Sequence, residues 1–190
     1  DIFLFDRQNK ISTLISKHTG NINYAPQDFS PDGTKLLFTS DSGSEFASLR
    51  SYDLATGQTA SAYQIAWDVQ GASYSKSGKY LLIYLNEDSR AAARLLDAAT
   101  MQPVTLTGMP VGMVRGIELS RDESKLAFYA TDGSAPNDLW AGSLGQAPTR
   151  LTDALNPQIK RDDLVVPQVT RFKSYDGVEV PGVLYRPHQA

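Results

Sequence analysis

The sequence predicts an all-β chain: a partial β-propeller of about three four-stranded blades, preceded by half of another blade and followed by a β-hairpin. Two observations support this fold class. A turn followed by an apolar triplet recurs at a constant spacing, and this repeat stops before a strand-rich segment of different composition.

The repeated feature appears first in the stretch DFSPDGTKLLFTS. Pro31 fixes one φ angle, Asp32 can bond its own backbone, and Gly33 accepts a positive φ, so a turn is expected before the apolar run. Later stretches repeat the pattern as SYSKSGKYLLIYL and ELSRDESKLAFYA.

The repeats share one register. Ser30, Ser75 and Ser120 are each 45 residues apart, and the apolar triplets 36–38, 81–83 and 126–128 follow at the same offset. A period of about 40–50 residues with short strands is typical of propeller blades. In the third copy Glu123 replaces the turn glycine, which predicts a turn that is strained or of another type.

Each repeat has room for four strands, the second being the apolar triplet with its flanks. The first strands are expected at 24–29, 72–74 and 116–119, the third at 46–54, 90–98 and 137–144, and the fourth at 58–64, 103–107 and 148–152. Gly57 and Gly145 suit the tight connections between third and fourth strands. Residues 90–99 are rich in Ala and Leu and could instead form a helix, but the repeat register favours a strand.

The predicted domain boundaries follow from this pattern. Blades occupy 1–153, a charged linker with two prolines occupies 154–168, and 169–190 holds the first strands of another domain. Within the propeller part, the half blade is 1–16 and the full blades are 24–64, 70–108 and 114–152. The first residues lack the features of a signal peptide and read as mature sequence already inside a strand, so we expect that the natural N-terminus is missing. The compartment stays open between periplasmic or secreted and cytoplasmic.

The composition excludes several classes of protein. The chain has 190 residues, 41% of them apolar, and its net charge of -3 does not suggest a nucleic-acid surface, which would need clustered Lys and Arg. No apolar run approaches the roughly 20 residues of a membrane span, so none is expected. It contains no cysteine, which excludes disulfides and thiolate metal sites.

The segment after the repeats, VTRFKSYDGVEVPGVLYRP, has a turn signal at Asp176-Gly177 between two strand-like runs. A propeller with SPDG-type turns followed by this hairpin resembles the prolyl oligopeptidase family of serine peptidases. The resemblance implies that an α/β-hydrolase domain follows the hairpin, that the whole protein cleaves peptides, and that no cofactor is needed. The turns alone are also found in TolB-like propellers.

No catalytic residue is expected within the chain. The serine motif G-x-S-x-G is absent, and the two histidines, His18 and His188, lie in loop-like stretches. No calcium-loop pattern is present, so no metal site is expected. The neighbouring carboxylates Asp41 with Glu45, Glu87 with Asp88, and Asp162 with Asp163 are interpreted as solvated loop charges.

The resemblance adds candidates for substrate binding. Some aminopeptidases of the family bind the substrate's amino terminus through propeller glutamates, and Glu45 and Glu87 are the candidates here, although neither matches a motif. Trp67 and Trp140 could stack on a ligand, but Trp140 lies within an expected strand and is interpreted as a core residue.

Three functions remain open at this point. The leading hypothesis is a non-catalytic propeller part of a serine peptidase that gates access of a peptide substrate. The alternatives are a TolB-like protein-binding module and a propeller lyase, the latter disfavoured by the scarcity of histidine. Because a row of three blades leaves its end faces uncovered, self-association through the end blades is also expected.

Overall fold

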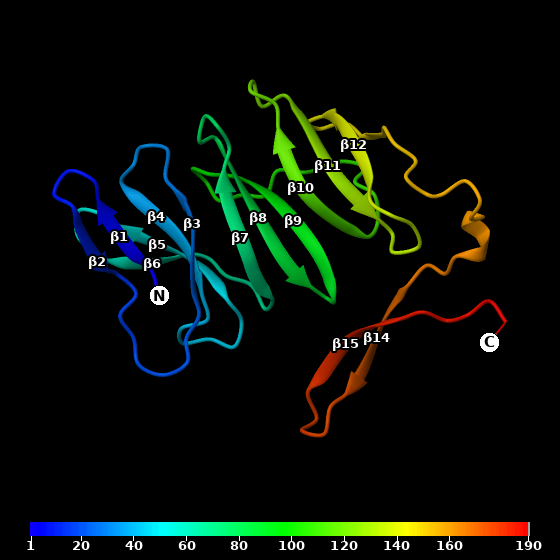
Figure 1. The fold of residues 1–190 in the computed structure, drawn as a ribbon, viewed down its shortest axis with the longest axis horizontal. Coiled ribbons are helices and arrows are strands. Elements are labelled where there is room, and N and C mark those ends of the chain that lie inside the picture. The colour runs from blue at the N-terminus through cyan, green and yellow to red at the C-terminus, as the bar shows by residue number, and fades with distance from the viewer. Residues whose placement is uncertain (190) are drawn as a thin grey trace. The chain divides into compact units, whose positions relative to one another are not determined.

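The computed structural model describes residues 1–189, and its regular structure is almost entirely β (Figure 1). The chain forms two compact units, one made of 1–85 with 96–102 and the other of 86–95 with 103 onward. Among the described residues, no helix is both long and apolar enough to cross a membrane.

The first unit begins with the antiparallel pair β1 (Phe3–Asp6) and β2 (Ile11–Leu14), which forms a sheet of its own. The next sheet, blade one, has the order β3-β4-β5-β6. Its strands are β3 (Tyr24–Phe29), β4 (Lys35–Ser40), β5 (Ser48–Asp53) and β6 (Thr59–Tyr63). These are the four strands that the repeat predicts for this blade.

The core of this region is made by the apolar triplet. Leu36 and Phe38 are buried with Ile2, and Ile15, Tyr24 and Tyr52 pack against them. Every residue of β4 after Lys35 is buried, because the strand lies inside its sheet and is covered on both faces.

Blade two has three strands, in the order β7-β8-β9. They are β7 (Asp68–Tyr74), β8 (Tyr80–Glu87) and β9 (Arg90–Asp97). The helix considered for 90–99 is therefore not formed. The fourth strand expected at 103–107 was wrong: only an isolated bridge forms at Pro103, which has no amide hydrogen to donate to a ladder.

Blade one contacts β7 through side chains of its first strand. A bulge between Pro26 and Phe29 interrupts the pairing of β3 with β4. The side chains of Gln27 and Asp28 accept hydrogen bonds from the backbone N–H groups of Ala72 (3.2 Å) and Tyr74 (2.9 Å). The bulge thus places two acceptors against the edge of the next blade.

The repeated turns have the same hydrogen bonds in all three copies. The amides of Gly33, Gly78 and Glu123 donate to the carbonyls of the serines that open the turns, at 2.8–2.9 Å. All three residues have positive φ, 69°, 80° and 58°. Glu123 therefore keeps the same turn at the cost of backbone strain, as its place in the repeat predicts.

Blade three belongs to the second unit and has the order β10-β11-β12-β13. Its strands are β10 (Met113–Leu119), β11 (Lys125–Thr131), β12 (Asp138–Ser143) and β13 (Thr149–Arg150). A bulge between Arg115 and Glu118 repeats the irregularity of blade one. After the blade come a short 3-10 helix, η1 (Arg161–Asp163), and the antiparallel hairpin of β14 (Gln168–Lys173) and β15 (Glu179–Leu184).

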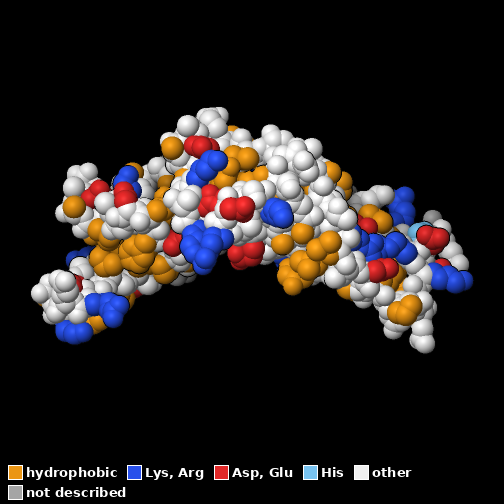
Figure 2. All heavy atoms as spheres, turned by 90° about the horizontal axis from the view of Figure 1, so that it is seen from above, with side chains coloured by type: hydrophobic (Ala, Val, Ile, Leu, Met, Phe, Trp, Pro, Cys, Tyr) orange, Lys and Arg blue, Asp and Glu red, His pale blue; other side chains and the backbone are white. Residues whose placement is uncertain are grey.

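Many apolar side chains remain exposed. On the face seen in Figure 2 they gather in patches separated by acidic and basic side chains. In the β1–β2 pair, Phe3 is 62% exposed and Ile11 58%, because this two-stranded sheet has no further strand beside it. In the hairpin, Phe172 and Tyr175 are also exposed. Such surfaces are typical of interfaces.

Candidate functional site

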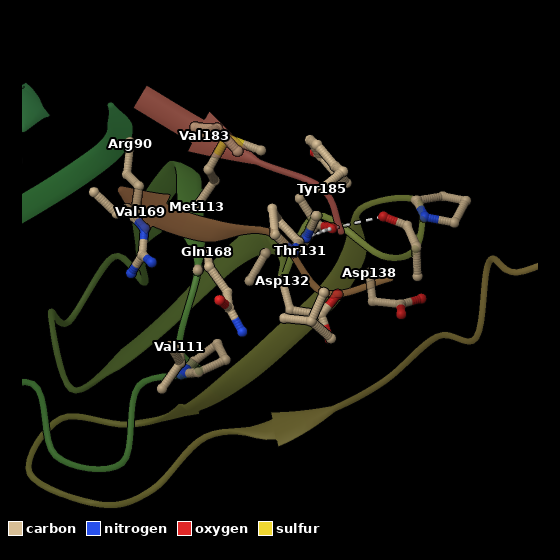
Figure 3. Close-up of a pocket in the computed structure, with 18 of the residues that line it drawn as sticks. Arg90, Val111, Met113, Thr131, Asp132, Asp138, Gln168, Val169, Val183 and Tyr185 are labelled. Atoms are coloured by element: carbon tan, nitrogen blue, oxygen red, sulfur yellow. Dashed lines mark hydrogen bonds between the residues drawn. The ribbon is translucent and has the colours of Figure 1, made fainter. Parts of the chain in front are cut away.

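A cavity of about 720 Å³ lies within the second unit. Its walls come from the start of β9, the segment that enters β10, the end of β11 with the loop that follows, and both strands of the hairpin (Figure 3). Arg150 and Arg161 complete the lining. The cavity therefore forms where the hairpin meets blade three.

Much of the cavity wall is apolar and open to solvent. Val111 is 81% exposed, Val183 45% and Tyr185 55%. Trp140 also lines the cavity and stacks on Phe128, with ring centroids 6.4 Å apart and planes 8° from parallel. Trp140 thus has the core contact expected from its strand and, in addition, a side that faces the cavity.

Two ion pairs account for four of the five charged side chains in the lining. Arg150 Nε lies 3.0 Å from Asp138 Oδ2, and the buried Asp138 also accepts hydrogen bonds from Thr152 and Ala154. Arg161 Nη1 lies 4.0 Å from Asp132 Oδ2.

The carboxylate of Asp132 is held in its charged form. Burial raises its pKa, but hydrogen bonds donated by the hydroxyl and amide of Ser134, together with the charge of Arg161, outweigh burial, so that the pKa lies below its ordinary value. Asp132 is therefore anionic near neutral pH and pairs with Arg161.

The fifth charged side chain, Arg90, has no such partner. Among residues 1–189 its guanidinium makes no hydrogen bond and no ion pair, although it is half-buried and lines the cavity. Figure 3 shows it beside the strand that carries Gln168 and Val169. An unpaired guanidinium in a partly apolar cavity is a ready site for an anion.

The hairpin is attached to the tight turn between β8 and β9. Asp88 and Ser89 both have positive φ, 52° and 62°, although neither is glycine. The hydroxyl of Ser89 donates to the carbonyl of Pro181 at 3.0 Å, and Arg171 Nη2 lies 2.6 Å from Asp88 Oδ1. Both strained residues thus contact the hairpin, which offsets part of the strain.

The two candidate glutamates lie outside the cavity lining. Glu87 receives two hydrogen bonds from Arg94, 2.8 and 2.7 Å long, which is the geometry of a structural ion pair. Glu45 is exposed in the loop between β4 and β5. A substrate-binding role for either residue stays a prediction.

The other candidate residues have local structural contacts. His18 Nδ1 lies 2.8 Å from the carbonyl of Ser16, and its ring lies 5.1 Å from that of Tyr24. His188 Nε2 is 3.3 Å from the carbonyl of Leu164. Asp41 accepts the amide of Asn23, and Trp67 lies against Phe46. Among the described residues, no group of His, Cys, Asp or Glu could hold a metal ion.

Sequence reasoning missed Arg90 and the Asp88-Ser89 turn. Arg90 lies in a stretch whose Ala and Leu content favours a helix, and a single arginine in such a stretch is no motif for anion binding. The distance along the chain between Arg90 and the hairpin leaves no local pattern that predicts their proximity. One signal was present: a two-residue connection between two strands commonly requires positive φ at both positions.

No protein-family model matches the sequence, and no curated protein matches it. Solved structures do match in fold. TolB from Acinetobacter baumannii aligns with 79% of this chain at 22% identity and a TM-score of 0.55. One structure from a study of two prolyl endopeptidases aligns with 90% at 16% identity and a TM-score of 0.67.

A puromycin-hydrolyzing peptidase of Mycobacterium tuberculosis aligns with 92% of this chain at 12% identity and a TM-score of 0.70. This chain spans only 37%, 25% and 27% of the lengths of TolB, the prolyl endopeptidase and the puromycin-hydrolyzing peptidase. The described strands and these likenesses agree with the fold expected from the repeat: the chain has a partial β-propeller fold like those of TolB and the prolyl oligopeptidase-type peptidases.

Proposed function

We propose that this chain is the non-catalytic propeller part of a serine peptidase of the prolyl oligopeptidase family, with β14 and β15 as the first strands of its hydrolase domain. The observation that carries the proposal is the hairpin. It follows the last blade after a linker and is joined to the blade-two turn through Asp88 and Ser89. A propeller that acts alone has no need of such an added sheet.

The structural neighbours support the same assignment. The two peptidases align with 90% and 92% of the chain, whereas TolB aligns with 79%. The propeller strands β1 to β13 end at Arg150, so a protein that has only the propeller in common leaves the C-terminal fifth unmatched. The larger coverage by the peptidases is the result expected if they share the hairpin as well.

The proposed division of labour follows from the chemistry that the chain lacks. The sequence has no G-x-S-x-G motif, so the nucleophilic serine and the acyl-enzyme step belong to the hydrolase domain. The propeller then covers the active site and admits short or unstructured peptides. In this role the chain selects substrates by access and carries out no bond cleavage itself.

A serine-reactive phosphonate probe tests the proposal. The full-length protein should be labelled at a serine outside residues 1–190, and the isolated chain should stay unlabelled. Hydrolysis by the full-length protein should fall steeply between a short peptide and a folded protein that contains the same cleavage site. Labelling within residues 1–190, or a gene without a hydrolase domain beside this segment, contradicts the assignment.

The second candidate is a TolB-like protein-binding propeller, supported by the TolB likeness and by the exposed apolar side chains. It predicts no labelling of the full-length protein by the phosphonate and no hydrolase motif in the gene. The same experiment therefore separates the two functions.

A further inference from the structure

We propose that the cavity of the second unit binds the free carboxyl terminus of a peptide that ends in an apolar residue, with Arg90 as the carboxylate-binding residue. The inference goes beyond the proposed function, because it concerns binding by this chain and involves no hydrolysis. It rests on the charges of the cavity, on its apolar wall and on one unpaired carboxamide.

The charges favour one anion. The cavity is lined by three arginines and two aspartates. Arg150 is paired with Asp138 and Asp153, and Arg161 with Asp132 and, at 3.9 Å, with Asp153. Arg90 is therefore the arginine of the lining that makes no ion pair among residues 1–189, and it is free to bind an anion. A guanidinium presents two parallel N–H donors to a carboxylate, which a neutral amide end cannot accept in the same way.

The apolar wall favours an apolar side chain next to that carboxylate. Met113, Val169 and Val183 come from β10, β14 and β15 and line the cavity (Figure 3). Trp140 of β12 also belongs to the lining. Val111 and Tyr185 add apolar surface that is largely exposed in the described chain. Covering this surface with a ligand side chain removes apolar area from water.

A peptide fits better than a simple fatty acid. Gln168 lines the cavity from an exposed position, and its carboxamide makes no hydrogen bond to another residue among 1–189, so it is available to a ligand. A carboxamide both donates and accepts, which matches a peptide group and gives no advantage to a hydrocarbon chain. The volume of about 720 Å³ lies in the range of pockets that hold ligands larger than a single amino acid.

Tryptophan fluorescence of the full chain tests the inference. The chain has two tryptophans, so Trp67→Phe leaves Trp140, in the cavity wall, as the only reporter. The probe is the acetylated tripeptide alanyl-alanyl-leucine with a free carboxylate, and the comparison ligands are its C-terminal amide and octanoate. We expect saturable binding of the acid at about 1 mM or below.

The amide and octanoate should each bind at least about 10-fold more weakly than the acid, because the amide lacks the charged hydrogen bonds and octanoate the peptide groups. Arg90→Gln should weaken binding of the acid by a similar factor, and Arg90→Lys by less. Arg121→Gln removes the same charge from an exposed turn outside the cavity and should leave binding unchanged.

Circular dichroism and a urea midpoint verify that the variants are folded. The comparison of the acid with the amide needs no substitution at position 90. It therefore tests recognition of the carboxylate even if Arg90→Gln fails to fold. Equal binding of acid and amide overturns the inference, as does absence of saturation at about 10 mM. Octanoate binding as tightly as the peptide overturns the peptide assignment and identifies a site for fatty acids.

Discussion

Replacement of Gly78 by alanine tests how the turns of successive blades fit together. Gly78 has φ +80°, and a Cβ built on it would lie 2.3 Å from Cγ and 2.9 Å from Cβ of Pro31, in the corresponding turn of blade one. Gly33 has nearly the same backbone, φ +69°, but no atom within 4 Å of its built Cβ. The two glycines therefore differ in one respect, the contact with the proline ring.

The expected cost can be separated into two parts. Alanine at a left-handed position costs about 1 kcal/mol after the loss of chain freedom in the unfolded state is included, and this applies to both sites. At Gly78 the clash with the rigid proline ring adds about 1–3 kcal/mol. We expect Gly33→Ala to lower the free energy of unfolding by about 1 kcal/mol and Gly78→Ala by about 2–4 kcal/mol.

Urea denaturation followed by circular dichroism measures both variants under the same conditions. Pro31→Gly removes the proline ring and with it the clash. In the double variant, most of the extra loss of about 1–3 kcal/mol in the free energy of unfolding caused by Gly78→Ala should therefore disappear. Equal destabilisation by the two alanines, or no coupling between positions 31 and 78, refutes the reasoning.

Three further predictions concern the turns and the hairpin. Hydrogen bonds from Ser30 and Thr34 lower the pKa of Asp32 to about 2, and those from Ser120 and Ser124 lower the pKa of Asp122 to about 2. Because these values lie below the ordinary value of 3.8, the stabilisation is complete above about pH 4 and is lost as the pH falls through about 2. The double variant Asp32→Asn, Asp122→Asn should therefore flatten the fall in urea midpoint over this interval, and an unchanged fall contradicts the prediction. Lys10 is exposed and has φ 58°, and the equivalent position in the turn of blade one is Gly57. Because glycine adopts a positive φ without a steric penalty, Lys10→Gly should raise the free energy of unfolding by about 0.5–1 kcal/mol. Lys10→Ala keeps a Cβ atom and should not raise it. Arg171→Gln removes the ion pair with Asp88, so it should speed hydrogen exchange across the β14–β15 hairpin but not in β4. In a double-mutant cycle, the coupling energy between Arg171→Gln and Asp88→Asn should be about 0.5–1 kcal/mol. Unchanged exchange in the hairpin shows that the contact with Asp88 does not anchor it.

The blade strands could be predicted because their signals are local and repeated. The turn residues set the start of each second strand, and the buried triplets such as Leu36-Leu37-Phe38 identify its central position in the sheet. The register of the repeat also gave the right choice at 90–97, where the local composition favours a helix.

Two features could not be predicted in this way. The repeat assigned a strand to 103–107, but its first residue is a proline and the ladder is not extended beyond a single bridge. The cavity depends on the packing of the hairpin against the end of β11 and the start of β9, and no local pattern in the sequence encodes that proximity. The role proposed for Arg90 rests on the absence of an ion-pair partner among residues 1–189, which no sequence pattern shows.

The connection between the third and fourth strands contains a second repeated turn, whose aspartate was not predicted. Asp53 accepts hydrogen bonds from the amides of Ala55 and Thr56, and Asp97 accepts the equivalent bonds from Ala99 and Thr100. These bonds lower the pKa of both aspartates. Both repeats contain the spacing D-x-x-T, but the residue that follows it is glycine at position 57 and methionine at position 101, so a glycine signal identifies only the first of the two turns.

The contact between Pro31 and Gly78 makes the copies of the repeat non-interchangeable. A copy with glycine at the fourth turn position can follow one that carries proline at the second, because the missing side chain leaves space for the ring. The third copy, which has Glu123 at that position, could not follow a copy with proline in the same way, because the Cβ atom of the glutamate would clash with the proline ring. A recombined or shuffled propeller assembled from these modules must therefore respect their order, and a permutation that places the third module directly behind the first should misassemble.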